Sequence, residues 1–481
     1  MTWETVIGLE THVELSTKTK IFCSCSTAFG GDPNTRCCPV CTGMPGALPV
    51  MNRAVMRYAV RAGLALNCQI ARSHRFDRKN YFYPDLPKAY QISQLYLPIA
   101  VNGSLPIRLP SGTEKVIRIH EMHMEEDAGK LMHDLLTRRS RADYNRCGVP
   151  LIEIVTEPDF RNAEEVITYL EKLKSTLEYL GISDCKMQEG SLRCDVNLSV
   201  RPAGSNILGT RTEMKNLNSF RAVTRAIAYE SRRQIELIET GMQVVQETRR
   251  WDEDRNVSFP MRSKEDAQDY RYFPEPDIPP MEITEEYLQD TRASLPEMAE
   301  ARKERYISQF GLPVYDADML TSQKALADFF ERAVDLGGIP GEVAHWIMGE
   351  VLRTLKERPQ EAADIPLKPE TLVALLQLIK DGRINRSTAV EVFDAIFDTN
   401  ADPEAYVREH GLEQISDVSL VESIVLNVLA ENPKSADDYR SGKQKAFGFL
   451  VGQTMRALQG KGDPKTVNRL LHEKLISSDK K

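Results

Sequence analysis

The sequence predicts an α+β fold in which a sheet-rich N-terminal domain precedes two helical domains. Residues 1–293 are dense in Gly, Pro, aromatic residues and short alternating runs, which are typical of strands and long loops. From residue 294 onward, apolar residues recur at helical spacing instead. We therefore expect a sheet-rich domain over residues 1–293, an all-helical domain over residues 294–408 and a small helical tail domain over residues 409–481.

The composition is that of a globular chain with ample core. Of its 481 residues, 41% are hydrophobic and 27% are charged, which excludes wholesale disorder, a collagen-like fibre and a small disulfide scaffold. A net charge of −8 prevents the whole surface from coating nucleic acid non-specifically, although one local basic face is allowed. The start lacks the features of a signal peptide, and no run of 18 apolar residues occurs. We expect a cytoplasmic protein without a membrane segment.

Two helices are expected inside the first domain. Apolar residues at helical spacing predict one over residues 163–180, ended by Gly181. The second, over residues 220–240, follows Ser219, a residue type that caps helices, and ends at Gly241. The rest of this domain is interpreted as strands and loops.

The tail domain is the one cationic region of an acidic chain. Its pattern predicts a helix that stops at Asn432–Pro433 and a last helix that begins at Asp463–Pro464. From Lys434 onward, eleven Lys and Arg residues stand against five Asp and Glu residues, a balance of +6, whereas the preceding residues sum to −14. We expect this tail to bind RNA phosphates, and the alternative is a solvated helical face. The candidate residues are Lys443, Lys445, Arg456, Lys461, Lys465 and Arg469.

Alternation along residues 6–15 places ionisable groups on one face of a predicted strand. Glu10, His12 and Glu14 share that face, and apolar residues occupy the other. Such groups are costly to bury unless something positive lies beside them. This strand therefore indicates a site for a cation.

Four further predicted strands repeat the pattern. Their polar faces carry Glu121, His123 and Glu125 (residues 117–127, ending in Glu126 and Asp127), Glu153 and Glu157 (151–157), Asp195 and Asn197 (193–200), and Arg211, Glu213 and Lys215 (210–215). Carboxylates with an occasional His suit Mg²⁺, especially Mg²⁺ that also holds nucleotide phosphates. From the alternation alone, a cation-binding cleft and a solvated sheet face lined with exposed charges fit these strands equally well.

A loop over residues 75–91 mixes Lys and Arg with Tyr and Phe in a Pro-rich, non-helical stretch, and residues 269–277 form a second such segment. Cations can neutralise phosphate, and aromatic rings can stack on a base. An aromatic-anchored surface loop is the alternative for either segment alone. Neither a P-loop nor a G-x-G-x-x-G motif opening a helix occurs, so any ATP site must be of another type.

Five of the nine cysteines lie between residues 23 and 41. Cys23 and Cys25 form one pair, and Cys38 and Cys41 form another after twelve intervening residues. Four thiolates at this zinc-ribbon-like spacing match a tetrahedral, structural Zn²⁺ site, which leaves none of them as a nucleophile. Cys37 could replace Cys38, although the spacing to Cys41 favours Cys38. Free cysteines in a hairpin are the less favoured alternative. The crowding also favours a reducing compartment over a disulfide set.

Several long motifs are distributed along the first domain. They are residues 6–15 (VIGLETHVEL), 79–91 (KNYFYPDLPKAYQ), 123–130 (HMEEDAGK), 143–146 (DYNR), 148–154 (GVPLIEI), 190–197 (GSLRCDVN), 213–219 (EMKNLNS) and 270–277 (YRYFPEPD). These motifs resemble those of the B subunits of the tRNA-dependent amidotransferases that make Gln-tRNA and Asn-tRNA. The resemblance covers essentially the whole chain, including a tail similar to a small stand-alone tRNA-associated domain.

The resemblance implies that the first domain is a cradle with a glutamine-synthetase-like catalytic cleft for ATP and Mg²⁺. It implies a carbon–nitrogen ligase with glutamine as the amido-N donor. The side-chain carboxylate of mischarged Glu-tRNA(Gln) or Asp-tRNA(Asn) would be phosphorylated, and ammonia would then displace phosphate. A separate amidase subunit would release and channel the ammonia, and a small third subunit would complete a heterotrimer. Some family members lack the cysteines, but this chain has both pairs, so structural zinc is expected.

Roles within the cleft follow from residue chemistry. We expect Glu10, His12 and Glu125 to hold Mg²⁺, with Asp195 or Glu213 as a candidate further ligand. The predicted catalytic set is Glu10, His12, Lys79, Glu125, Asp195 and Glu213. Lys79, Arg78 and Lys88 are expected to face phosphate or the acyl-phosphate. The predicted cofactor-binding residues are Arg78, Tyr81, Tyr83, Lys88, Tyr90, Glu153 and Lys215.

Two other classes of function remain. A free-standing ATP-dependent ammonia ligase acting on a small acid would show the same cleft chemistry, but it would need neither a helical domain nor a basic tail. A non-enzymatic tRNA-binding scaffold would use the zinc and the tail, but its stacked carboxylates would repel phosphates unless a metal were bound.

Overall fold

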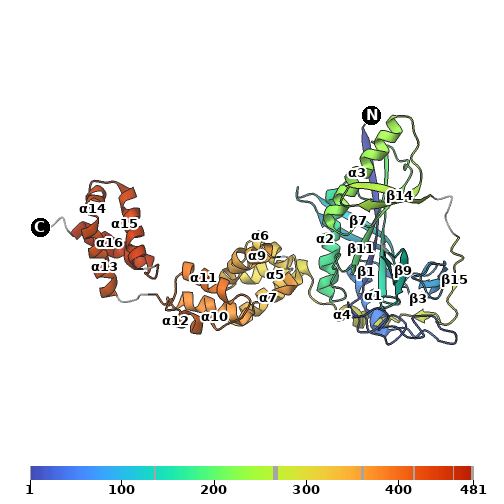
Figure 1. Ribbon diagram of the computed structural model, residues 1–481, viewed down its shortest axis with the longest axis horizontal. Coiled ribbons are helices and arrows are strands. Elements are labelled where there is room, and N and C mark those ends of the chain that lie inside the picture. Colours follow the sequence, from blue (N-terminus) through green and yellow to red (C-terminus); the bar gives the residue numbers. More distant parts are fainter. Residues whose placement is uncertain are drawn as a thin grey trace. The chain divides into compact units, whose positions relative to one another are not determined.

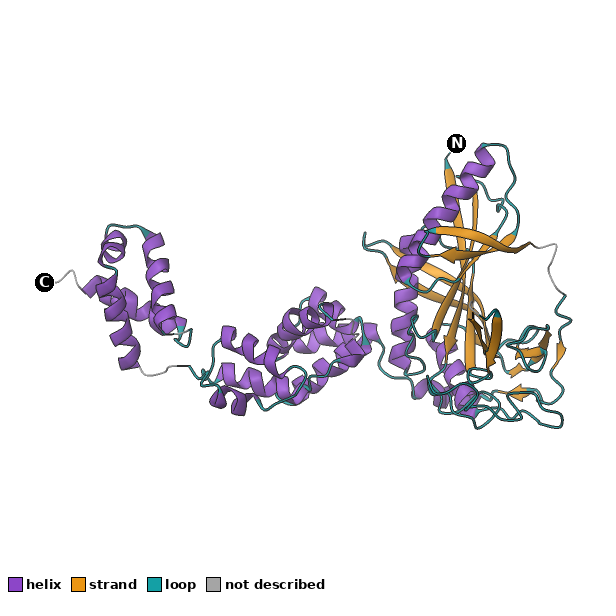
Figure 2. Cartoon of the chain, viewed as in Figure 1, coloured by secondary structure: helices purple, strands orange, loops and turns teal. Residues whose placement is uncertain are grey.

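The computed structural model describes residues 2–134, 137–263, 269–358, 362–414, 418–458 and 460–477. The chain divides into two compact units, Met1–Met298 and Ala299–Lys481 (Figure 1). The first unit combines sheets with helices, whereas the described residues of the second unit form helices and no strand (Figure 2). The predicted α+β class is therefore confirmed, and the predicted boundary at residues 408–409 stays a prediction.

A nine-stranded sheet organises the first unit, in the order β14-β13-β12-β11-β1-β10-β7-β6-β2. Neighbouring strands run antiparallel except β12 and β13, which are parallel. The strands are β1 (Trp3–Glu14), β2 (Gln69–Ile70), β6 (Ala100–Arg108), β7 (Glu114–Glu126), β10 (Pro150–Thr156), β11 (Leu192–Pro202), β12 (Thr212–Lys215), β13 (Glu247–Asp252) and β14 (Val257–Ser263). The N-terminal strand thus lies in the middle of the sheet.

Three small sheets accompany the large one, in the orders β15-β4-β5, β16-β3 and β8-β9. Their strands are β3 (Ser73–His74), β4 (Asp77–Asn80), β5 (Tyr90–Ser93), β8 (Lys130–Asp134), β9 (Arg139–Asp143), β15 (Phe273–Pro274) and β16 (Met281–Glu282). The first of these sheets joins the two aromatic and basic segments of the sequence, because β15 pairs with β4.

Helices α1 (Arg53–Ala65), α2 (Ala163–Leu180) and α3 (Phe220–Glu239) supply apolar residues to the core beneath the large sheet (Figure 1). A fourth helix, α4 (Glu285–Ala293), contacts α1. Both sequence-predicted helices are confirmed. Gly181 ends α2 at φ 66°, in the left-handed region that favours glycine. The Ser219 side chain accepts a hydrogen bond from the amide of Ala222 and so caps α3.

The helices cover one face of the sheet and leave its polar face to the functional residues. Along β1, Ile7, Leu9 and Val13 are buried in the core, while Glu10 and His12 are half-buried on the opposite side. The alternation predicted from the sequence is therefore confirmed for this strand. This alternation places the ionisable side chains of β1 on the polar face of the sheet.

The second unit contains α5 (Ala299–Phe310), α6 (Val314–Thr321), α7 (Lys324–Asp335), α8 (Pro340–Trp346), α9 (Leu352–Lys356), α10 (Pro369–Lys380), α11 (Arg386–Ile396), α12 (Pro403–Glu409), α13 (Val418–Glu431), α14 (Pro433–Arg440), α15 (Gln444–Ala457) and α16 (Pro464–Ser477). A π-helical turn (Ile347–Val351) and a 3₁₀ turn (Ala362–Asp364) connect some of them. The last four helices share a core of their own, which includes Val425, Leu450 and Leu471.

Two predicted helix boundaries in the tail are confirmed. Helix α13 ends at Glu431, just before Asn432–Pro433, and α16 begins at Pro464. The carboxylate of Asp463 accepts hydrogen bonds from the Thr466 amide (2.9 Å) and hydroxyl (2.6 Å), which caps that helix. Among the described residues, no helix has the length and apolar character needed to cross a membrane.

Candidate active site

Strand register brings the ionisable residues of the polar face side by side. His12 of β1 lies opposite Glu153 of β10, which lies opposite His123 of β7. On the other side of β1, Glu10 lies opposite Asp195 of β11. Residues paired in this way point to the same side of a sheet, so the groups form two neighbouring clusters.

The first, which we call the histidine–carboxylate cluster, consists of His12, Glu125 and Glu153. One ligand atom from each lies within 4.8 Å of the others. His12 Nε2 is 3.3 Å from Glu153 Oε2 and 3.5 Å from Glu125 Oε1. His123 Nε2 lies 3.1 Å from the same Glu153 oxygen, so Glu153 is shared between two imidazole rings.

The charges of this cluster shift one another strongly. Burial raises the pKa of Glu125, and the neighbouring Glu153 adds to that effect. Burial also opposes ionisation of Glu153, but His123 and His12 hold its pKa well below the ordinary value. Burial disfavours a charged His123 ring, yet Glu153 and Glu121 raise its pKa to about 10. The imidazole rings of His12 and His123 therefore keep the carboxylate of Glu153 charged.

The second, which we call the acidic cluster, consists of Glu10, Asp195 and Glu213, whose ligand atoms also lie within 4.8 Å of one another. Asn197 Nδ2 donates to Glu10 Oε1 at 2.8 Å. The Lys215 ammonium pairs with Asp195 and lies 2.7 Å from Glu213 Oε1. Burial opposes the charge of Lys215, yet these two carboxylates raise its pKa, while burial and then Glu153 raise the pKa of Glu10. Lys215 thus balances part of the negative charge.

The structure divides the predicted magnesium ligands between these clusters. His12 and Glu125 lie together, but the third member of their group is Glu153, which the sequence assigned to cofactor binding. Glu10 instead groups with Asp195 and Glu213. Glu14, on the same face of β1, lies near Asp127, and burial together with that neighbour raises its pKa to about 7.

The aromatic segments lie next to the histidine–carboxylate cluster. Lys79 of β4 holds its ammonium 5.1 Å from the centre of the Tyr270 ring, and its charge acts to lower the pKa of Glu125. Tyr81 packs edge-on against Tyr270, with ring centres 5.9 Å apart. Burial raises the pKa of Tyr272, and nearby Glu125 contributes to the rise. The sequence identified the segment holding Tyr270 and Tyr272 without assigning either residue to the site.

Two of the three predicted phosphate-facing cations already have protein partners. Arg78 donates to Glu275 at 2.7 and 2.9 Å and stacks over Tyr90, 4.2 Å from the ring centre. Lys88 is buried and pairs with Glu126. The charge of Lys79, by contrast, acts on Glu125 of the histidine–carboxylate cluster. Tyr83 is exposed.

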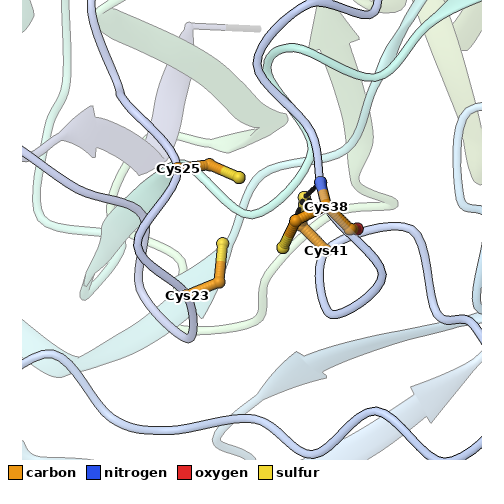
Figure 3. Close-up of side chains that lie close together, drawn as sticks. All are labelled: Cys23, Cys25, Cys38 and Cys41. Carbon is orange, nitrogen blue, oxygen red and sulfur yellow. Dashed lines mark hydrogen bonds between the residues drawn. The ribbon is translucent and has the colours of Figure 1, made fainter.

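Four cysteines form a separate cluster (Figure 3). The Sγ atoms of Cys23, Cys25, Cys38 and Cys41 lie within 4.8 Å of one another, and Cys41 is buried. A hydrogen bond from Cys23 and another from the Cys38 amide (3.2 Å) lower the pKa of Cys41 to about 4. The thiol of Cys37 instead donates to the Asn34 carbonyl at 3.3 Å. Four sulfurs at these separations fit the donor set of a tetrahedral zinc ion.

A cavity of about 100 Å³ separates the cysteine cluster from the Lys88–Glu126 pair. Its lining includes Cys41 and the buried Lys20, whose ammonium lies 3.5 Å from Cys41 Sγ. Charged residues and apolar residues, among them Phe22 and Ile92, line the cavity together.

Comparison with known proteins gives matches along nearly the whole chain. Residues 5–289 match the family model described as the GatB/GatE catalytic domain, and residues 328–475 match the one described as the GatB domain. A protein of Lachnoclostridium phytofermentans is 59% identical over 473 residues, covering 98% of this chain and 99% of its own length. Relatives from Caldicellulosiruptor saccharolyticus (99% of each chain) and Thermoanaerobacter pseudethanolicus (99% of this chain, 100% of its own) are each 56% identical. All three are named as B subunits of an aspartyl/glutamyl-tRNA(Asn/Gln) amidotransferase.

Proposed function

Because the chain belongs to the family of aspartyl/glutamyl-tRNA(Asn/Gln) amidotransferase B subunits, we propose that it carries out the ATP-dependent transamidation of mischarged Glu-tRNA(Gln), Asp-tRNA(Asn) or both. The expected family is confirmed by the matches. The proposed product is Gln-tRNA or Asn-tRNA, made by a carbon–nitrogen ligase that works as one subunit of a complex.

The reaction needs an activated carboxylate. A carboxylate is a poor electrophile because its leaving group would be oxide. We propose that the side-chain carboxylate oxygen of the aminoacyl group attacks the γ-phosphorus of ATP, which releases ADP and leaves an acyl-phosphate. Ammonia then attacks the carbonyl carbon, the C–O bond to phosphate breaks, and inorganic phosphate and a proton leave.

The observation that carries this proposal is the pair of adjacent clusters on one sheet face. Carboxylate and imidazole ligands of this kind suit Mg²⁺, which neutralises the charge of nucleotide phosphates during phosphoryl transfer. The histidine–carboxylate cluster would hold one ion and the acidic cluster a second. Such a pair would bring the β- and γ-phosphates over β1, between β10 and β11.

The cationic and aromatic residues would then receive the substrate. Lys79 lies close enough to influence Glu125, so we assign it to the transferred phosphoryl group. Tyr81 and Tyr272, both partly buried beside that cluster, would exclude water from the acyl-phosphate. Arg78 and Lys88 would hold the loop through their own ion pairs.

The remaining expectations complete the proposal. We propose that the first unit is a cradle comparable to the catalytic cleft of glutamine synthetase, and that the four-cysteine cluster holds a structural Zn²⁺. The relatives are named as one subunit of an amidotransferase, which implies companion subunits. We propose an amidase that releases ammonia from glutamine and a small third subunit as its partners, with channelling of ammonia to the cleft.

One experiment separates this function from its alternatives. The complex should hydrolyse ATP in the presence of Glu-tRNA or Asp-tRNA, and hydroxylamine should trap the acyl-phosphate as a hydroxamate. Hydrolysis stimulated by free glutamate would indicate a small-acid ligase. Tight tRNA binding without stimulated hydrolysis would indicate a scaffold.

A further inference from the structure

The second cysteine pair belongs to a tight turn, residues 38–43, which we call the cysteine knuckle (Figure 3). The Gly43 amide donates to the Val40 carbonyl at 3.1 Å, and the φ of Gly43 is 69°, in the left-handed region that favours glycine. A Cβ atom at Gly43 would lie 3.2 Å from Lys88 Cα and would overlap the Lys88 side chain. The knuckle therefore packs directly against Lys88, and the missing side chain of Gly43 permits that approach.

Lys88 lies near the end of a hairpin that also carries Lys79. Strands β4 and β5 pair antiparallel, and residues 81–89 connect them. The Lys88 ammonium pairs with Glu126, and Ala89 next to it has a φ of 59°, a strained value for a residue with a side chain. Such a backbone conformation persists only where surrounding contacts impose it. The contacts made at Lys88 therefore help to set the shape of this hairpin.

A buried lysine forms a second connection between the cysteine cluster and the hairpin. Lys20 is fully buried, and its ammonium lies 3.5 Å from Cys41 Sγ and donates to the Tyr144 carbonyl at 3.3 Å. The Tyr144 hydroxyl in turn donates at 3.0 Å to the carbonyl of Pro84, in the hairpin loop. An ammonium excluded from water needs a negative partner, which a thiolate supplies. Lys20 and Tyr144 thus link a sulfur of the cluster to the hairpin.

The two cysteine pairs differ in how they are anchored. Cys23 and Cys25 closely follow Ile21, which is buried in the core of the first unit. Met44 and Leu48, which follow the knuckle, are exposed instead. A metal ion bound by all four sulfurs would join the knuckle to the anchored pair, and so would hold the knuckle against the hairpin.

We propose that the metal-bound cysteine knuckle positions the β4–β5 hairpin for phosphoryl transfer, with Gly43 as the positioning residue at the contact. The inference rests on the proposed function, in which Lys79 of the same hairpin meets the transferred phosphoryl group. The cysteine cluster then affects the rate of the reaction as well as stability, although no cysteine touches the substrate. A cluster with a purely structural role would stabilise the first unit and leave Lys79 unaffected.

Two glycine variants of the assembled complex separate these cases. Gly43→Ala and Gly46→Ala each place a side chain on backbone with positive φ, 69° and 83°, so both lose stability through similar strain. Only the variant at Gly43 meets Lys88. In the described part of the chain, a Cβ atom at Gly46 would have no neighbouring atom within 4 Å.

The kinetic effect should be confined to one variant. Gly43→Ala should lower kcat for amidation about ten- to a hundredfold, the range for a small displacement of a catalytic group. The KM for Glu-tRNA and the zinc content should stay the same, because neither tRNA binding nor the four sulfurs are altered. Gly46→Ala should match the wild type in all three measurements.

Hydrogen exchange gives a readout that needs no activity. Removal of zinc by a chelator that spares Mg²⁺ should speed exchange of the amides in residues 79–91 of the wild-type complex several-fold. Zinc added back should reverse the change. In Gly43→Ala the same amides should exchange faster even with zinc bound. Amides of α2 serve as the internal control and should exchange at the same rate throughout.

Three results would overturn the inference: an unchanged kcat in Gly43→Ala, an equal loss of kcat in both glycine variants, or exchange in residues 79–91 that is indifferent to zinc. If Gly43→Ala fails to fold, the exchange of the wild-type complex decides alone. Each of these results leaves the proposed function standing as long as Glu125→Gln is inactive. Conversely, full activity of Glu125→Gln would remove the proposed cation site whatever the glycine variants do.

Discussion

Oε2 of Glu153, on β10, lies 3.3 Å from Nε2 of His12, on the neighbouring strand β1. The two residues are far apart in sequence and meet only because β10 pairs with β1 in this register. His123 approaches the same oxygen, and the two rings keep the pKa of Glu153 low. A charged carboxylate is therefore held in place on the polar face at neutral pH, with the two imidazole rings as its partners.

Replacing a ligand of this cluster should stop the chemistry without unfolding the protein. We expect Glu153→Gln or Glu125→Gln to lower kcat for ATP-dependent amidation by about a hundredfold or more, because transition-state charge is no longer neutralised. Glu157→Gln is the matched control, since Glu157 pairs with the exposed His120. Amidation rates at saturating Mg²⁺ give the measurement. Equal rates for all three variants would place the cation elsewhere.

Lys215 should neutralise part of the negative charge of Asp195 and Glu213 when no metal ion is bound. Its removal in Lys215→Met leaves Asp195 and Glu213 without their cation, so stability in EDTA should fall by about 2 kcal/mol. Added Mg²⁺ should restore much of it. The control is Lys115→Met, which breaks the Lys115–Glu165 pair (2.7 Å) away from the clusters. Melting curves with and without Mg²⁺ give the measurement. If Mg²⁺ stabilised both variants equally, the proposed ion at the acidic cluster would be contradicted.

Elemental analysis should find one zinc ion per chain. Cys41→Ser should abolish it and lower thermal stability, because structural zinc couples to local folding. Cys37→Ser should keep the metal, since the Cys37 sulfur hydrogen-bonds to Asn34 outside the cluster. Loss of zinc from Cys37→Ser with retention in Cys38→Ser would exchange the assignments of those two residues.

Acid should destabilise the fold through His74. This ring is fully buried, and neither of its nitrogens has a hydrogen-bond partner among the described residues. Burial lowers its pKa from 6.5 to about 4. The unfolded chain therefore binds a proton first, so this contribution to stability is complete above pH 6.5 and is lost as the pH falls toward 4.

The loss should reach about 2–3 kcal/mol across that window. His74→Phe removes the titration, and the difference in unfolding free energy between variant and wild type should change with pH by that amount. Urea denaturation at about pH 7 and about pH 4 measures it. A constant difference at both values would mean that His74 is not the group responsible.

The tail should bind tRNA through its unpaired cations. Lys443 pairs with Asp438 and Arg469 with Glu473, whereas Lys445 and Arg456 of α15 have no ion pair among the described residues. The double variant Lys445→Ala/Arg456→Ala should raise the KM for Glu-tRNA several-fold and reduce the slope of log K against log salt by about 0.7–0.9 per lost contact.

The paired cations provide the control for this prediction. Lys443→Ala/Arg469→Ala has the same change of net charge but should have a smaller effect. Glutaminase activity of the partner without tRNA should stay the same in both double variants. Equal salt slopes for the wild type and both variants would show that tRNA is held elsewhere.

The sequence predicts what is local. The caps at Ser219 and Asp463, the end of α2 at Gly181 and the alternation along β1 all depend on neighbouring residues, and the structure confirms each. The cysteine spacing likewise distinguishes Cys38 from Cys37, because only the former shares the cluster.

The sequence does not predict which side chains come together across neighbouring strands, because that depends on strand order and register. Whether Glu10 or Glu153 joins His12 depends on which strands flank β1 and at what offset, and no local pattern contains that information. The same holds for Lys88, which was expected to face phosphate. Its partner Glu126 belongs to β7, and burial of the pair follows from tertiary packing.

The central position of β1 has a consequence for the protein's synthesis. Residues 3–14 leave the ribosome well before their partners on either side, which lie in residues 150–156 and 192–202. At about 5–20 residues per second, this strand waits roughly 7–30 s before its first partner has been made. Its apolar face and its unpaired backbone edges are exposed for that interval, so slow translation would prolong the risk of aggregation.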